Sequence, residues 1–298
     1  MMRICFALAA AGSCASLALA QVDGSIVGDG YGAAYAVQTV QTQFGDANPN
    51  GGSELNAAYA RISGGRFYLT LTGNLENNFN KLEIFLQTGP GGNNVFDSAG
   101  NDNAGNMDGL TFASGFAPNY HLIARRGNGV FDLDFANLNN QSASGYFNIL
   151  NGGDFGSGAT GTGVNGQAIE VGFNGSNIAG VTGGTGPADQ MAALAVTTGL
   201  ELSIALSDLG LQGLDGEQIC VMAFVNNQDH NYASNQFLPG LTPPQGNMGG
   251  DGAGNFTGVV NFNLNNFQQQ GYFVVPVPAP SAAAILGLGA LAVARRRR

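Results

Sequence analysis

Residues 54–72, ELNAAYARISGGRFYLTLT, have the pattern of a β-hairpin. Two runs of apolar and alternating residues, 54–62 and 66–72, flank the three-residue turn Ser63-Gly64-Gly65. Glycine adopts the positive φ angles that short hairpin loops require, so this spacing predicts two antiparallel strands. The hairpin is the strongest local signal in the chain, and it places the domain in the all-β class.

Short runs of the same kind recur after this hairpin, separated by clusters of Gly, Asn and Asp. The further expected strands are 81–87, 111–116, 120–125, 131–135, 145–150, 168–173, 200–206, 218–225, 259–264 and 272–275. Glycine is abundant, at 48 of 298 residues, and clear amphipathic helical patterns are lacking. About a dozen short strands between turns predict one two-sheet, jelly-roll-like β-sandwich over residues 21–275.

The first 20 residues have the pattern of a secretory signal peptide. Arg3 supplies a positive charge, residues 4–11 are apolar, and Ala18-Leu19-Ala20 forms a small-residue cleavage site. Cleavage there would make Gln21 the first residue of the exported chain. A lipoprotein signal that uses Cys14 is the alternative.

The last 23 residues, 276–298, have three parts that together indicate a sorting tail. The proline-rich motif Val277-Pro278-Ala279-Pro280 precedes an apolar run at 281–294, and four arginines end the chain. Fourteen residues are fewer than the roughly 20 that an untilted helix needs to cross a bilayer. The arginines are expected to stay on the cytoplasmic side. These properties fit either a short transmembrane helix whose tail is cut off or an uncleaved anchor.

This tail resembles a PEP-CTERM sorting signal, which is recognised in bacteria by exosortase-type enzymes. The residues that match its motif and its basic end are Val277, Pro278, Pro280, Arg295, Arg296, Arg297 and Arg298. Ala279 stands where the family usually has Glu. The resemblance implies export, transient or lasting attachment to the membrane with a cytoplasmic C-terminus, and an exosortase-type partner.

The charge of the segment between the two signals narrows the range of partners. Ten basic residues are present, and Arg3 with the four terminal arginines accounts for five of them. The remaining five face all twenty acidic residues, which gives the body a net charge of −15. Such a body repels nucleic acid and anionic membrane surfaces. With Cys220 as its single cysteine, it has no intramolecular disulfide, and the apolar run around Cys220 predicts a buried thiol.

The body also resembles the DOMON-like sandwiches, which include the family-nine carbohydrate-binding modules. The resemblance rests on Asp23-Gly24, on the alternating run 68–71, and on GLELSIAL at 199–206 before Leu209-Gly210. It implies the sandwich fold. It does not imply a carbohydrate ligand, because the ligand platform of those modules typically uses tryptophan and this chain contains none.

Residues 93–108, NNVFDSAGNDNAGNMD, are rich in oxygen donors. Asp97, Asp102 and Asp108, with the asparagines between them, have the chemistry of a calcium site, because Ca²⁺ binds six to eight oxygen ligands. The spacing matches no EF-hand loop, and an ordinary Gly/Asn loop is the alternative. Calcium is the one cofactor that the sequence indicates.

Two further sets of residues have side chains of the types that act in catalysis. Asp132 and Asp134 alternate with apolar neighbours in the run 131–135, so both carboxylates are expected on one solvated outer face. A glycosidase-type carboxylate pair is the alternative. His121 lies in an expected strand and His230 in a polar loop, without the spacing of a zinc site.

The expected function is therefore that of an exported, non-catalytic protein of the cell surface or extracellular matrix. The alternative is a module that binds extracellular polysaccharide, which an exposed row of tyrosines on one sheet would favour. A secreted hydrolase that uses Asp132 and Asp134 is a third hypothesis.

Overall fold

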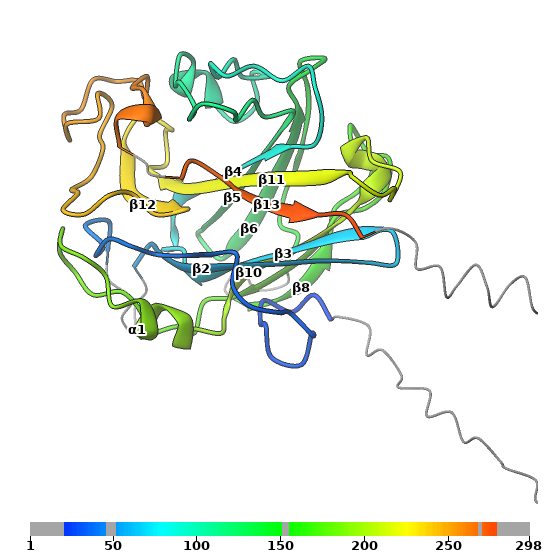
Figure 1. The fold of residues 1–298 in the computed structure, drawn as a ribbon, viewed down its shortest axis with the longest axis horizontal. Helices are drawn as coiled ribbons and strands as arrows, with labels where there is room; N and C mark the ends of the chain where they lie inside the picture. The colour runs from blue at the N-terminus through cyan, green and yellow to red at the C-terminus, as the bar shows by residue number, and fades with distance from the viewer. Residues whose placement is uncertain (1–20, 46–51, 151–154, 268–269, 279–298) are drawn as a thin grey trace, which may run out of the picture.

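The computed structural model describes residues 21–45, 52–150, 155–267 and 270–278, which form two antiparallel sheets packed face to face (Figure 1). In spatial order the first sheet contains β1 (Ala36–Val37), β2 (Glu54–Ser63), β3 (Arg66–Asn74), β10 (Gly199–Ala205), β9 (Glu170–Asn174) and β8 (Phe155–Ala159). The second contains β12 (Ala233–Leu238), β11 (Gln218–Asn226), β4 (Asn78–Gln87), β5 (Tyr120–Gly127), β6 (Val130–Asn137) and β7 (Ser142–Tyr146), and β13 (Phe273–Pro276) also pairs with β11. The prediction of an all-β fold with two packed antiparallel sheets is confirmed.

The predicted hairpin is strands β2 and β3, joined in the expected register. Ser63 pairs with Arg66 across the turn, and Gly64 and Gly65 have φ angles of 58° and 75°. Side chains alternate along β3, so Phe67, Leu69 and Leu71 enter the core between the sheets, while its other side chains lie on the outer face of the first sheet.

The second sheet is buried on both faces. Leu82, Ile84 and Leu86 of β4 face the first core, which lies between the sheets. Phe85 of the same strand faces a second core on the opposite side. Cys220 of β11 is buried in this second core, as its apolar surroundings predicted.

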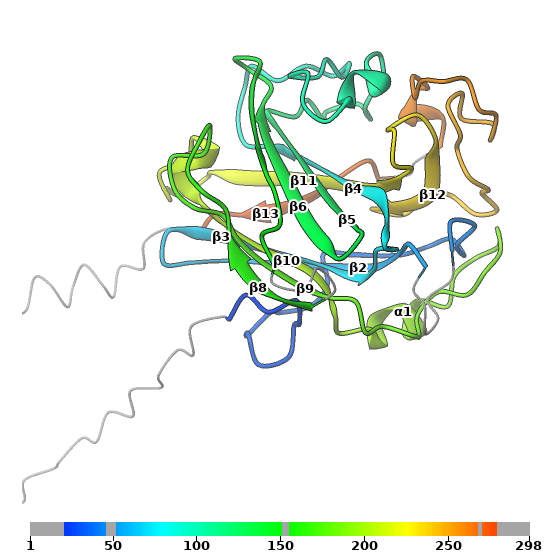
Figure 2. The same cartoon turned by 180° about the vertical axis from the view of Figure 1, so that it is seen from behind.

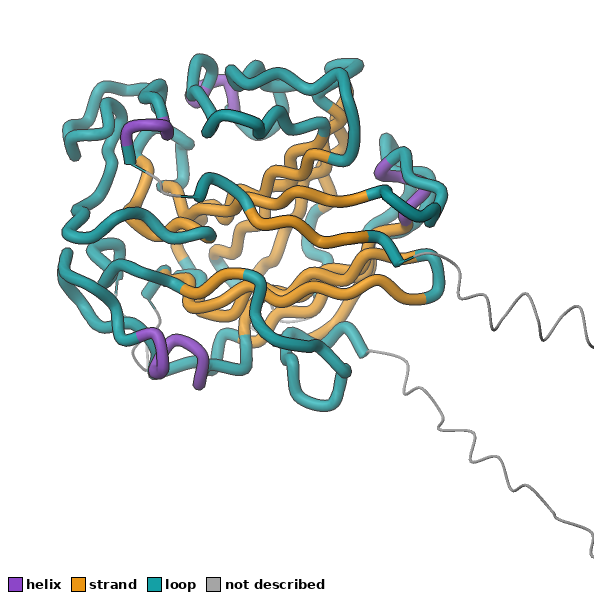
Figure 3. The backbone as a smooth tube through the Cα atoms, viewed as in Figure 1, coloured by secondary structure: helices purple, strands orange, loops and turns teal. Residues whose placement is uncertain are grey.

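Two long loop regions cover the second core, and we call them together the cap. The cap consists of residues 93–118, with the 3-10 helix η1 (Ala104–Met107), and residues 239–267, with η3 (Leu264–Asn266) (Figures 2 and 3). Its halves are joined by backbone bonds, for example from Thr111 N–H to the Phe262 carbonyl at 3.0 Å. The cap therefore forms a third layer, which covers the face of the second sheet that points away from the first sheet.

The cap also explains two wrong strand predictions, 111–116 and 259–264. Both runs contribute apolar side chains to the second core, but isolated bridges such as Thr111 with Asn263 replace a continuous ladder. The alternating pattern predicted correctly that these side chains are buried. It predicted wrongly that the backbone of both runs pairs in strands. Three strands were missed, because β1 has only two residues, and neither β8, which reads FGSGA, nor β12, which reads ASNQFL, is strongly apolar. The expected strand 145–150 overlaps β7 only at residues 145 and 146. The six-residue helix α1 (Gln190–Ala195) was also missed.

The C-terminal end of the described domain lies two residues beyond the expected boundary at Val275. Strand β13 continues to Pro276, and Val277 is buried in the first core, with its N–H bonded to the Glu217 carbonyl at 2.9 Å. The motif expected to begin the tail therefore begins inside the sandwich. Among the described residues, no helix has the length and apolar character that crossing a bilayer requires.

Candidate functional site

A set of charged residues lies between the second sheet and the cap, and we call it the ion network. Its members are Lys81 and Glu83 of β4, His121 and Arg125 of β5, Asp132 and Asp134 of β6, Asp102 of the cap, and His230 of the loop after β11. The strand residues share one face because they alternate with core residues, and the register places Arg125 opposite both Lys81 and Asp132.

Glu83 is the centre of this network and is fully buried. Its carboxylate contacts His121 Nε2 at 2.9 Å and His230 Nδ1 at 2.7 Å, and both rings are also fully buried. Burial by itself raises the pKa of Glu83, but the two histidines outweigh it and hold the pKa well below its usual range. Burial likewise lowers the pKa of His230, yet Glu83 and Asp102 raise it to about 9. His230 is therefore an imidazolium at neutral pH.

Arg125 and Lys81 connect the cap to the sheet through Asp102. The Asp102 carboxylate lies 2.8 Å from Lys81 Nζ, 3.1 Å from an Arg125 nitrogen and 3.4 Å from His230 Nε2. Arg125 also pairs with Asp134, and with Asp132 at 3.6 Å. Burial raises the pKa of Asp102, but its hydrogen bonds to His230 and Lys81 lower it below the usual value. The arrangement holds three strands, the cap and the His230 loop together.

This network corrects the expectation for Asp132 and Asp134. They do share one face of β6, as the alternation predicted, but that face is not solvated, and both side chains are buried. Asn101 and Asp102 of the cap lie beside Asp134, and Asn148 N–H donates to Asp132 at 2.8 Å, so distant and neighbouring segments cover this face. Glu83 was missed as a site residue. The signal for it was a charged residue within the otherwise apolar run 82–86, LEIFL.

The three predicted calcium ligands of the cap have separate roles. Asp102 belongs to the ion network, and Asp108 accepts a hydrogen bond from Ser98 N–H at 2.8 Å. Asp97 is exposed. In the described part of the chain, these three carboxylates are not gathered within ligand distance of one another.

A different set of carboxylates does converge, on the outer face of the first sheet, and we call it the acidic cluster. Asp23 and Asp29 come from the segment before β1, and Glu201 comes from β10. One ligand oxygen from each lies within 4.8 Å of the others. Glu201 accepts hydrogen bonds from Asp23 N–H at 3.0 Å, from Gly24 N–H at 3.2 Å and from the Tyr31 hydroxyl at 2.8 Å.

The electrostatics of the acidic cluster follow from its burial. Glu201 and Asp29 are both buried, and burial raises the pKa of Glu201 to about 7. Burial also raises the pKa of Asp29. Its Oδ1 atom accepts a hydrogen bond from Gln21 N–H at 3.0 Å, whereas its Oδ2 atom has no hydrogen-bond partner in the described structure.

An open groove of about 340 Å³ lies where the loop before β1 meets α1 and the cap. Tyr35, Gln190 and Gln270 line it, together with the threonines at 39 and 242. Tyr35 is 38 % exposed, and its ring packs against Phe273 at a centroid distance of 5.8 Å. An aromatic face flanked by amides and hydroxyls has the chemistry to bind a polar, ring-shaped ligand.

No protein-family model, curated protein or solved structure matches this chain.

The predicted export residues lie largely outside the described part of the chain. Ala18 and Ala20 do so at one end, and Ala279, Pro280 and the arginines 295–298 at the other. Gln21 is described, and its backbone bond to Asp29 places the expected mature N-terminus beside the acidic cluster.

Proposed function

We propose that this chain is an exported, non-catalytic protein of the cell surface or extracellular matrix. The observation that carries the proposal is the ion network, in which both histidines are buried and paired with Glu83, while Asp132 and Asp134 are buried and paired with Arg125. Groups held in this way stabilise a fold and are not presented to a substrate. The role is therefore one of display and adhesion by a rigid domain.

In this proposal, the two ends of the chain direct its export and its sorting to the cell envelope. Residues 1–20 act as the signal peptide, and the tail from Pro276 onward acts as a PEP-CTERM-like signal with a short membrane helix and an arginine stop. An exosortase-type enzyme would act on the extended motif around Pro278 and Pro280. Pro278 is exposed whereas Val277 is buried, so the motif becomes accessible only after Val277.

Processing of the tail is tested on protein recovered from the host envelope and medium. We expect mass spectrometry to find a chain that begins at Gln21 and contains no peptide beyond about Pro280. The reason is that cleavage after Val277 leaves the first core intact. A control variant that ends at Pro280 should be released into the medium without processing. Recovery of the intact Arg298 end would contradict cleavage, and an intact Met1 end would contradict export.

The groove at Tyr35 supports a second function, the binding of extracellular polysaccharide. Tyr35 is exposed beside amide and hydroxyl side chains. The row of exposed tyrosines that would have extended this site is not present on the described outer face of the first sheet, because Tyr59 and Tyr68 are buried there. The proposed site is therefore a single stacking position in a groove.

The Tyr35→Ala variant tests this second function. We expect saturable binding of the full chain to the host's own extracellular polysaccharide, weakened about fivefold by the substitution, since the lost stacking is worth about 1 kcal/mol. Phe155→Ala, at an exposed aromatic residue on the edge strand β8, is the matched control and should bind like the wild type. Equal binding by both variants, or no binding by the wild type, would rule out the groove.

A further inference from the structure

We propose that Asp23, Asp29 and Glu201 form a calcium site that holds the first residues of the exported chain against strand β10. Nothing in the proposed display function requires this site. It also differs from the sequence-predicted calcium loop, which lies in the cap over the other sheet. The proposal rests on the geometry of the acidic cluster and on one buried oxygen atom.

The geometry matches the size of the ion. Calcium binds oxygen at about 2.3–2.6 Å, so two oxygens on the same ion are at most about 5 Å apart. The three carboxylates offer ligand oxygens within 4.8 Å of one another. Among the described residues, this is the one group of three acidic, histidine or cysteine side chains that meets this condition.

The Asp29 Oδ2 atom is the second, independent observation. Asp29 is only 6 % exposed, and this oxygen has no hydrogen-bond partner in the described structure. A buried carboxylate oxygen without a partner is costly, and such atoms are rare in folded proteins unless water or an ion occupies the place beside them. A cation bound between Asp29 and Glu201 would supply the missing partner.

The negative charge of the acidic cluster is not paired with a basic side chain in the described structure, which favours a bound cation. Arg61 is the basic residue that acts on Asp29, but its guanidinium stacks over the Tyr68 ring at 4.5 Å and lies 5.7 Å from the Tyr31 ring. No ion pair joins Arg61 to these carboxylates among the described residues. Three carboxylates with irregular geometry suit Ca²⁺, whose coordination is flexible, better than Mg²⁺, which requires a near-ideal octahedron.

The site would exist only in the folded protein, because Asp23 and Glu201 are 178 residues apart in the chain. An ion that binds only the folded state stabilises it. Here it would anchor the segment from Gln21 to Tyr31, since Gln21 bonds to Asp29 and Tyr31 bonds to Glu201. Calcium at extracellular concentrations would then complete the domain after export.

The experiment is a calcium titration of the full chain after removal of divalent ions with a chelator. We expect one equivalent of Ca²⁺ to bind with a Kd of about 0.1–1 mM, the range of extracellular calcium modules. At 10 mM Ca²⁺, we expect the Tm to rise by roughly 4–8 °C. Asp29→Asn should weaken binding at least tenfold, whereas Asp97→Asn, in the cap loop, should bind like the wild type.

A spectroscopic variant keeps the test decisive if Asp29→Asn folds poorly. The chain has no tryptophan, so its near-ultraviolet spectrum comes mainly from tyrosine. Calcium at Glu201 should alter the Tyr31 signal, and Tyr31→Phe should remove that change while it retains calcium binding. The proposal is overturned if the wild type binds no calcium. It is also overturned if Asp97→Asn abolishes binding while the Asp29→Asn variant retains it.

Discussion

The Glu83→Gln variant is expected to lose about 3–5 kcal/mol of its free energy of unfolding at pH 6.5, because it removes one partner from a buried ion pair. Glutamine has nearly the same shape as glutamate, so no cavity forms. The change leaves the His230 imidazolium without its main counter-charge at 2.7 Å, and the single amide oxygen can accept a hydrogen bond at only one of the two positions that His230 and His121 now share. Most domains have a total stability of only 5–15 kcal/mol, so this loss is severe.

The pH dependence of this loss identifies its cause. The pKa of His230 is raised from 6.5 to about 9, so His230 stabilises the fold fully below about pH 6.5, and the effect disappears as the pH rises through 9. Glu83 and Asp102 together cause this rise, so the variant should lose the part that Glu83 supplies. The difference between wild type and variant should therefore shrink steadily between pH 6.5 and 9. Glu201, whose pKa is also raised, contributes equally to both proteins and cancels.

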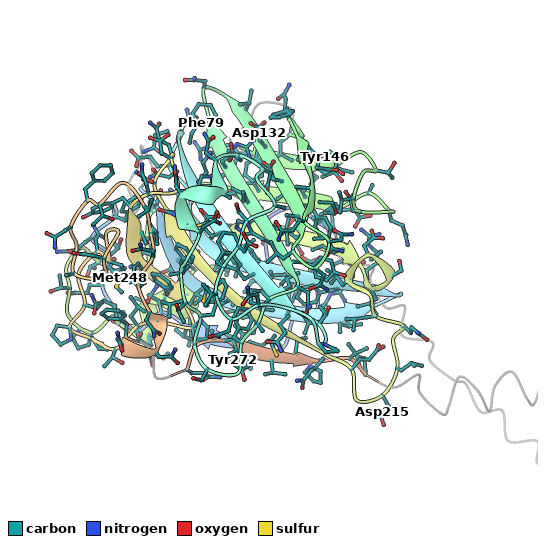
Figure 4. All side chains as sticks on the ribbon, turned by 90° about the horizontal axis from the view of Figure 1, so that it is seen from above. Phe79, Asp132, Tyr146, Asp215, Met248 and Tyr272 are labelled. Carbon is teal, nitrogen blue, oxygen red and sulfur yellow. The ribbon has the colours of Figure 1, made fainter. Side chains whose placement is uncertain are left out.

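Urea unfolding of both proteins at a series of pH values measures this difference. Asp215→Asn is the matched control, because Asp215 is an exposed carboxylate at the tip of the loop before β11, and its loss should change stability by less than about 0.5 kcal/mol (Figure 4). If Glu83→Gln were as stable as this control at pH 6.5, the ion network would not be a stabilising element.

The Phe85→Ala variant is expected to lose about 3–5 kcal/mol, and its effect should concentrate in the cap. Phe85 is fully buried at the centre of the second core, stacked on His121 at 4.4 Å and in edge contact with Phe96 and Phe112 of the cap. Its removal leaves a cavity between sheet and cap, while Leu82, Ile84 and Leu86 still fill the first core.

Unfolding measurements and hydrogen exchange test this prediction together. Amides of residues 93–118 should lose protection more than those of β2 and β3, because the cap contacts the missing ring directly. Phe256→Ala removes an equally large but exposed ring from the other half of the cap and should change stability by less than about 0.5 kcal/mol. Uniform loss of protection across both sheets in Phe85→Ala would show that cap and sandwich are not separable layers.

Local pattern was enough to find most strands and to place their faces. The glycine turn at Gly64 and Gly65 predicted the hairpin, and alternation predicted that Asp132 and Asp134 share a face. Alternation depends only on backbone geometry within one strand, so it can be predicted without knowledge of the fold. It could not say whether the polar face meets water, because that depends on the cap, which comes from distant parts of the chain.

The candidate sites depend on distant contacts even more strongly. Glu83 and His230 are 147 residues apart, and Asp23 and Glu201 are 178 apart, so no spacing rule could have joined them. The sequence by itself determined most of the strands, the sidedness of those strands, the acidity and the expected export signals, all of which are local or summed properties. Only the tertiary structure decided which charges are buried together, because desolvation and pairing arise when sheet, cap and N-terminal segment come into contact.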